Sequence, residues 1–132
     1  MIDITRINHV GLRVTDLATA RSFYGSLGFE FLVGPIGSEP VAIMEHPSGV
    51  NINFIWNADD SEKLNLLMDV PEKHTGYTHI ALEVDDLERT QSQLKKLGMT
   101  ITEGPITTPD GASFVFIRDP DDNVIEFHKP AP

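Results

Sequence analysis

The sequence predicts an α+β fold made of two tandem copies of one strand–helix–strand–strand–strand (βαβββ) module. The first observation behind this prediction is an internal repeat. Residues 8–17 read NHVGLRVTDL and residues 78–87 read THIALEVDDL, so that His9 corresponds to His79 at a separation of 70 residues. A pattern of this length at one fixed separation indicates a duplicated structural unit.

The second observation is that the ends of the two copies also correspond, now at a separation of 73 residues. The matching pairs are Pro47 with Pro120, Ile52 with Ile125, and Phe54 with Phe127. The change in separation implies a three-residue insertion in a loop of the second copy. The duplication is therefore complete, and Glu126 occupies the position equivalent to Asn53.

The elements of the first copy follow from residue periodicity and from end signals. Strands are expected at 6–14, 29–33, 41–45 and 50–56, and a loop at 34–37. A helix is expected to run to Leu27, with Asp16 as its N-cap and Gly28 as its left-handed C-cap residue.

The second copy begins at Tyr77 and repeats the same order of elements. Its helix is expected at 86–97 and its further strands at 99–103, 113–118 and 123–128, with a loop at 104–111. The length fits a single domain, 1–132, with module one at about 4–57, a connector at about 58–75 and module two at about 76–130.

Composition excludes several classes of protein. A formal net charge of −10 argues against nucleic-acid binding, which needs a basic surface. The absence of cysteine excludes thiolate metal sites and a cysteine nucleophile. The chain has neither a membrane-spanning apolar stretch nor the pattern of a signal peptide at its start, so a cytoplasmic protein that does not bind membranes is expected.

Four positions of the duplicated strands carry candidate metal ligands. Because side chains alternate along a strand, His9, Asn53, His79 and Glu126 are all expected on the sheet faces that the helices leave uncovered. A single histidine on a strand is more often packed or hydrogen-bonded than metal-binding. Two histidines and a carboxylate in agreeing positions instead predict a site for Zn²⁺, Mn²⁺, Fe²⁺ or Ni²⁺. His128 shares this face and is either a supporting residue or merely exposed.

The repeat, the FY pair at 23–24, the LGF triplet at 27–29 and the segment DPDDNVIE at 119–126 resemble the vicinal oxygen chelate superfamily. This superfamily contains glyoxalase I, extradiol dioxygenases, fosfomycin-resistance transferases and bleomycin-binding proteins. The resemblance covers nearly the whole chain. It implies two modules related by a pseudo-twofold axis, strands curling around a metal cavity, a small-molecule substrate and a homodimer.

The resemblance also implies roles for individual residues. His9, His79 and Glu126 match metal ligands of the family, and Glu126 matches its catalytic carboxylate. Asn53 is a candidate fourth ligand, although glyoxalase I carries a glutamate at the matching position.

Substrate contacts are implied at a second set of positions. Arg13 and Asn57 match residues that hold the glutamyl end of glutathione in glyoxalase I, and Trp56 lies beside Asn57 in the sequence. An alternative for Arg13 is a structural ion pair with Glu83, its equivalent in the second repeat.

The function expected first is therefore a metal-dependent lyase or isomerase resembling lactoylglutathione lyase. Such an enzyme would convert a hemithioacetal, a glutathione adduct, through an enediolate. One alternative is a ring-cleaving dioxygenase of the extradiol type, and another is a non-catalytic binding protein of the bleomycin-resistance type. A fosfomycin transferase is ranked lower, because Gly11, Pro105 and Pro109 lie at or near positions where those enzymes carry threonine, lysine and serine.

Overall fold

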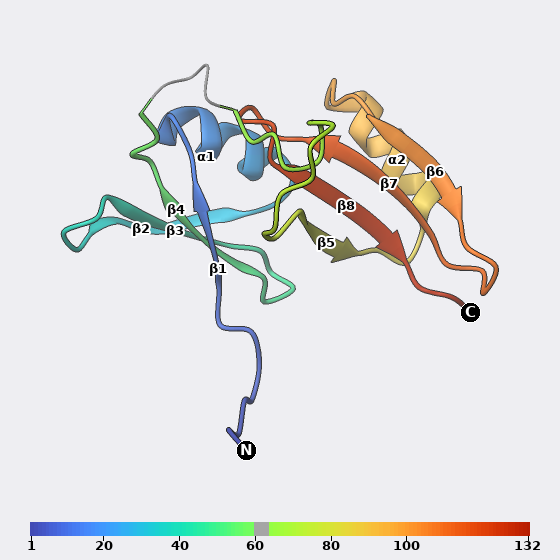
Figure 1. Ribbon diagram of the computed structural model, residues 1–132, viewed down its shortest axis with the longest axis horizontal. Coiled ribbons are helices and arrows are strands. Elements are labelled where there is room, and N and C mark those ends of the chain that lie inside the picture. The colour runs from blue at the N-terminus through green and yellow to red at the C-terminus, as the bar shows by residue number, and fades with distance from the viewer. Residues whose placement is uncertain (60–63) are drawn as a thin grey trace. The chain divides into compact units, whose positions relative to one another are not determined.

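The computed structural model describes residues 1–59 and 64–132 (Figure 1). It divides into two compact units, Met1–Lys63 and Leu64–Pro132. The first unit contains β1 (Val10–Arg13), α1 (Leu17–Ser26), β2 (Glu30–Ile36), β3 (Val41–Glu45) and β4 (Asn51–Ile55). The second contains β5 (His79–Glu83), α2 (Leu87–Lys96), β6 (Glu103–Thr107), β7 (Ser113–Arg118) and β8 (Val124–Lys129).

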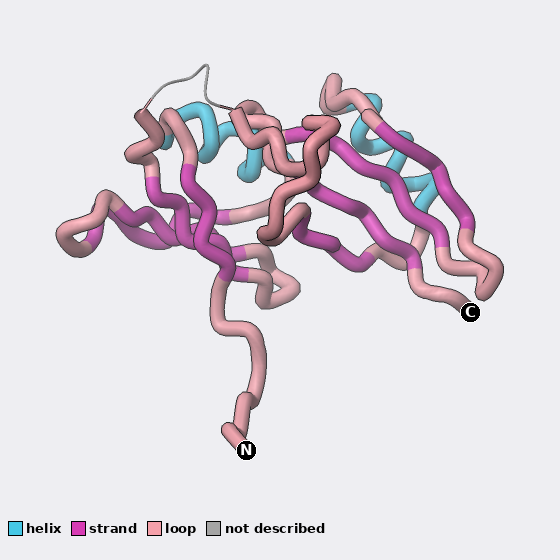
Figure 2. The backbone as a smooth tube through the Cα atoms, viewed as in Figure 1, coloured by secondary structure: helices cyan, strands magenta, loops and turns pink. Residues whose placement is uncertain are grey.

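Both units have the same sheet topology. The first sheet has the strand order β1-β4-β3-β2 and the second has the equivalent order β5-β8-β7-β6. In each sheet the strand before the helix pairs in parallel with the last strand, and the other pairings are antiparallel. Figure 2 shows the strands of each curled, open sheet. The prediction of an α+β fold with two tandem βαβββ modules is therefore confirmed.

The helix ends form as the sequence predicts. The side chain of Asp16 accepts a hydrogen bond from the backbone N–H of Thr19, and Asp86 caps α2 in the same way through Arg89. These caps satisfy amide groups that the first helical turn leaves without an intrahelical partner. At the other end of α1 the C-cap is Leu27 rather than the predicted Gly28, and Gly28 directly after it has the left-handed φ of +100° that was predicted for the end of the helix.

Each sheet buries an apolar core on its helix side. In the first unit the ring centroids of Tyr24 on α1 and Phe54 on β4 lie 4.9 Å apart, and both side chains are almost fully buried. In the second unit Leu94 on α2 and Ile125 on β8 are buried in the equivalent way. Because side chains alternate along a strand, burial of Phe54 and Ile125 directs Asn53 and Glu126 to the helix-free face.

Two predicted loops are in part strands. β2 continues through Gly34 and Pro35, and β6 lies at Glu103–Thr107 rather than at 99–103. Both are edge strands, which tolerate proline because the side of the strand that faces away from the sheet needs no N–H donor. Glycine is required at position 34 because a Cβ there would lie 2.7 Å from the Cα of Ala42. The Gly-Pro pairs thus mark irregular edge strands, not the end of the sheet.

The predicted first strand is too long at its start. β1 begins at Val10 rather than at residue 6, since its pairing with β4 runs only from Val10 with Ile52 to Arg13 with Ile55. His9 is therefore an exposed residue immediately before the strand.

The later part of the expected connector packs against the turn between β7 and β8. The backbone N–H of Asn65 donates to the carbonyl of Asp121, and its side-chain amide donates to Asn123 Oδ1, both at 2.9 Å. The prediction of a connector at about 58–75 also includes residues 60–63, which lie outside the described residues.

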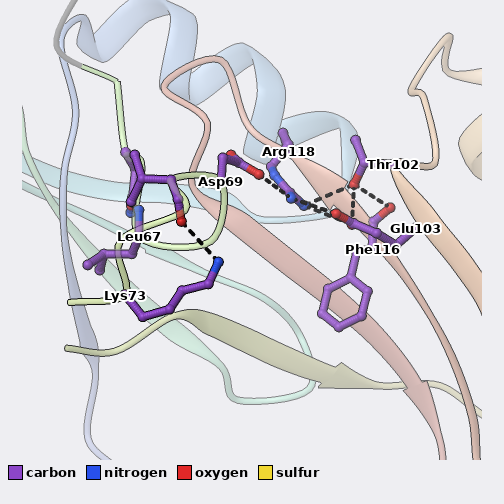
Figure 3. Close-up of polar contacts among 9 residues, drawn as sticks. Leu67, Asp69, Lys73, Thr102, Glu103, Phe116 and Arg118 are labelled. Atoms are coloured by element: carbon purple, nitrogen blue, oxygen red, sulfur yellow. Dashed lines mark hydrogen bonds and ion pairs between the residues drawn. The ribbon is translucent and has the colours of Figure 1, made fainter. Parts of the chain in front are cut away.

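Arg118 ties the same segment to the edge of the second sheet. Its guanidinium contacts Asp69 Oδ1 at 3.1 Å and Glu103 Oε1 at 2.8 Å, as Figure 3 shows. Hydrogen bonding from Arg118 holds the pKa of Glu103 below its ordinary value. We interpret this cluster as structural, because it joins the connector, β6 and the end of β7. None of the helices in the described ranges is long and apolar enough to cross a membrane.

Candidate metal centre

The second unit brings together three polar side chains on the helix-free face of its sheet. β5 and β8 run parallel, with His79 beside Val124, Ala81 beside Glu126, and Glu83 beside His128. Residues two apart on one strand share a face. This register places Glu126 close to His79 on the neighbouring strand and to His128 on its own.

Glu126 uses one carboxylate oxygen for each imidazole. Its Oε2 lies 2.9 Å from His79 Nε2, and its Oε1 lies 2.7 Å from His128 Nδ1. Only 7% of Glu126 is exposed. A buried carboxylate needs partners of this kind, because an unpaired charge away from water is strongly unfavourable.

Two aromatic rings of β7 support these imidazoles. Phe116 meets His79 edge-on at a centroid separation of 5.5 Å, and Phe114 stacks on His128 at 5.7 Å with an interplanar angle of 6°. The pairing of β7 with β8 sets Phe114 beside His128 and Phe116 beside Glu126. The orientation of each imidazole is thus fixed by packing as well as by the carboxylate.

The two repeat histidines share a further contact that the sequence analysis missed. His9 Nδ1 lies 2.8 Å from the amide oxygen of Asn8, and His79 Nδ1 lies 2.9 Å from the hydroxyl of Thr78. A ring whose Nδ1–H donates to the preceding side chain can offer its Nε2 lone pair to a metal ion, which in His79 would take the place of the Nε2–H that otherwise faces Glu126 Oε2. The available signal was that an oxygen-bearing side chain precedes the histidine in both repeats.

Asn53, the fourth predicted ligand, occupies the position in the first sheet that Glu126 occupies in the second. Asn53 pairs with Gly11 on β1, just as Glu126 pairs with Ala81 on β5. Asn53 is half-buried on β4. Its side chain offers an amide oxygen, a weaker ligand for a divalent ion than a carboxylate and not a base.

Two donor atoms of the second unit lie close enough together to share one divalent ion. Neighbouring ligand atoms at about 2.0–2.2 Å from an ion lie roughly 3 Å apart in octahedral geometry and roughly 3.4 Å apart in the tetrahedral geometry of Zn²⁺. The observed 2.9 Å between His79 Nε2 and Glu126 Oε2 is close to the octahedral separation and is also that of a hydrogen bond. Among residues 1–59 and 64–132, however, no group of three or more histidine, aspartate and glutamate side chains is arranged to hold an ion. The predicted third ligand, His9, belongs to the first unit.

The predicted substrate residues of the first unit form a short polar chain. Arg13 Nε donates to Asn57 Oδ1 at 3.0 Å, and Asn57 Nδ2 donates to Glu39 Oε2 at 2.8 Å. Glu39 was missed by the sequence analysis, because it lies in the turn between β2 and β3. Trp56 is half-buried just after β4, and its backbone N–H donates to the carbonyl of Pro40.

Comparison with known proteins identifies the family. The model of the Glyoxalase/Bleomycin resistance protein/Dioxygenase superfamily matches residues 6–127. The chain therefore belongs to this superfamily.

Individual relatives carry different names. The chain is 30% identical to a probable lactoylglutathione lyase of Vibrio cholerae, over 92% of this chain and 88% of the relative. It is 28% identical to the metallothiol transferase FosB of Bacillus licheniformis, over 95% of this chain and 75% of the relative. Among solved structures, a protein from the mobile metagenome of V. pseudocholerae superposes with a TM-score of 0.71 at 26% identity, covering 100% of this chain and 99% of the other.

Proposed function

We propose that this protein is a metal-dependent lyase or isomerase of the glyoxalase I-like type. Its substrate would be a hemithioacetal or a related small molecule with oxygen atoms on neighbouring carbons. The observation that carries the proposal is the buried Glu126 carboxylate, which lies within hydrogen-bonding distance of both His79 and His128. A carboxylate of this kind can serve both as a metal ligand and as a base.

His9, His79 and Glu126 would hold the metal ion, with Asn53 as a weak fourth ligand. When bound, a Zn²⁺, Ni²⁺, Mn²⁺ or Fe²⁺ ion supplies Lewis-acid polarisation of the substrate oxygens. Glu126 would take a proton from one substrate carbon and return it to the adjacent carbon. The substrate is isomerised without gain or loss of atoms, so no further reactant is needed.

Arg13, Asn57 and Glu39 would bind the charged end of the substrate. A guanidinium favours a carboxylate, and the Glu39 carboxylate at the other end of the chain favours an ammonium group. The relatives support a thiol-containing substrate, since one is named for lactoylglutathione and another for metallothiol transfer. Trp56 lies next to Asn57 in the sequence and would contribute an apolar contact.

The direct test is turnover of the hemithioacetal formed from methylglyoxal and glutathione, measured with each of the four metals added. Arg13→Ala is expected to raise KM about 10- to 100-fold with little change in kcat, because it removes binding that the ground state and the transition state share. Arg21→Ala is the matched control. It removes another arginine of the first unit, one whose guanidinium lies over the ring of Phe31.

Two results would oppose this proposal. One is the absence of turnover with every metal. The other is a KM for Arg13→Ala equal to that of Arg21→Ala, which would leave the Arg13–Asn57–Glu39 chain without a role in binding.

A second candidate function is transfer of a thiol to a small electrophile, which the 28% identity to a metallothiol transferase favours. The same ligands would serve that reaction. The product separates the two functions, because an isomerised hemithioacetal is a thioester that hydroxylamine cleaves, whereas thiol transfer to carbon gives a thioether that resists it.

A further inference from the structure

We propose that His128 is a positioning residue for Glu126. It holds one carboxylate oxygen and so presents the other oxygen, beside His79 Nε2, to the metal ion. The inference rests on the proposed metal site and assigns a role to a residue that the ligand set leaves out.

The two oxygens of Glu126 have separate partners. The distance of 2.7 Å from His128 Nδ1 to Oε1 is that of a charge-assisted hydrogen bond, in which the ring N–H donates to the carboxylate. The other oxygen, Oε2, lies 2.9 Å from His79 Nε2. The carboxylate is therefore oriented, with one oxygen committed to the protein and the other facing a ligand-type nitrogen.

The imidazole of His128 is itself held in place. It stacks on Phe114, the residue beside it on β7, with the two rings nearly parallel. It also lies two residues from Glu126 on the same strand, so strand geometry puts both side chains on one face. The strand spacing and the aromatic ring together aim Nδ1 at the carboxylate, and no adjustable loop is involved.

Orientation of this kind matters for metal binding. Ligating carboxylates are commonly hydrogen-bonded by an outer residue, and loss of such a partner typically weakens metal affinity 10- to 100-fold. Without His128, Glu126 could turn its Oε1 toward His79 or leave the site, because one of its two anchors would be gone. His128 is thus expected to act on metal affinity through Glu126, without touching the ion.

The test compares three substitutions in the full chain, with Zn²⁺ and Ni²⁺ affinities measured by isothermal titration calorimetry. His128→Ala removes the donor, whereas His128→Asn places an amide N–H close to where Nδ1 lies. His128→Gln carries its amide further out, near the position of Nε2. His74→Ala is the control, since it removes an exposed imidazole before β5.

We expect Kd to rise about 10- to 100-fold in His128→Ala and to return to within about threefold of the wild-type value in His128→Asn. His128→Gln should resemble His128→Ala, and His74→Ala should resemble the wild type. Melting temperatures measured without metal show whether each variant is folded. This pattern of rescue distinguishes a positioned donor from a residue that only fills space.

The inference is overturned if His128→Ala binds metal as tightly as the wild type, or if His128→Asn is as weak as His128→Ala. Metal binding that requires His79 but not His128 would overturn the inference and leave the proposed function standing. If the variants show the predicted affinities but the protein has no turnover, the role of His128 would stand and the proposed function would be overturned. A wild-type protein that binds neither of these ions, nor added Mn²⁺ or Fe²⁺, would overturn both.

Discussion

Glu126→Gln is expected to lower kcat at least 100-fold, and up to about 10⁴-fold, on any substrate that the wild type isomerises. The substitution keeps the size of the side chain but removes the base and the negative charge. Since Glu126 is buried between two imidazoles, water cannot readily take over its role. The measurement is kcat at saturating metal, because metal affinity should fall in the same variant.

Glu83→Gln provides the matched control for this prediction. Glu83 is an exposed carboxylate on β5, beside His128 in the pairing of β5 with β8. Its loss should change kcat less than about threefold, since Glu83 is neither a proposed metal ligand nor the proposed base. If Glu126→Gln kept the turnover of the Glu83→Gln variant, Glu126 could not be the catalytic carboxylate.

Asp119→Ala is expected to destabilise the protein by about 3 kcal/mol, the largest stability effect that we predict. Asp119 is almost fully buried in the turn between β7 and β8. Its carboxylate accepts hydrogen bonds of 2.8 Å from the backbone N–H groups of Asp121 and Asn123, and of 2.9 Å from the Asn123 side chain. The alanine variant leaves these donors without their charged acceptor.

Urea unfolding measures this effect, and Asp122→Asn is its control. Asp122 has a φ of +60°, which asparagine tolerates, so that variant removes one charge of the same turn without disturbing the backbone. Its change in unfolding free energy should stay within about 0.5 kcal/mol. Equal stabilities of the Asp119→Ala and Asp122→Asn variants would show that the Asp119 carboxylate does not organise the turn.

The fold was largely predictable from sequence because the chain repeats itself. The spacing of His9 and His79 defined the repeat, and Asp16 and Gly28 marked the ends of a helix by local chemistry alone. The edge strand β2 was ended too early and β6 was misplaced, because Gly34-Pro35 and Gly104-Pro105 have the local signature of a loop. Whether such a pair ends a strand depends on whether that strand has one neighbour or two, which is a property of the whole sheet.

The candidate ligands could be predicted from the sequence, but their supporting contacts could not. Period-two alternation put Glu126 on the helix-free face with His79, and the structure brings these two side chains within 2.9 Å. The supporting contacts of Thr78 and Glu39 were missed, because each depends on a side-chain rotamer or on a turn that periodicity does not describe. Comparing equivalent positions in the two repeats can select candidate ligands, but it does not reveal which side chains orient them.

The proposed function requires His9, His79 and Glu126 to bind one divalent metal ion. The most direct test is the metal content of tag-free protein by plasma mass spectrometry, measured beside a His9→Ala, His79→Ala double variant that remains folded. We predict about one ion per chain in the wild type, and its loss in the variant. A wild type that neither contains metal nor binds added Zn²⁺, Ni²⁺, Mn²⁺ or Fe²⁺, or a double variant that retains its ion, would contradict the account.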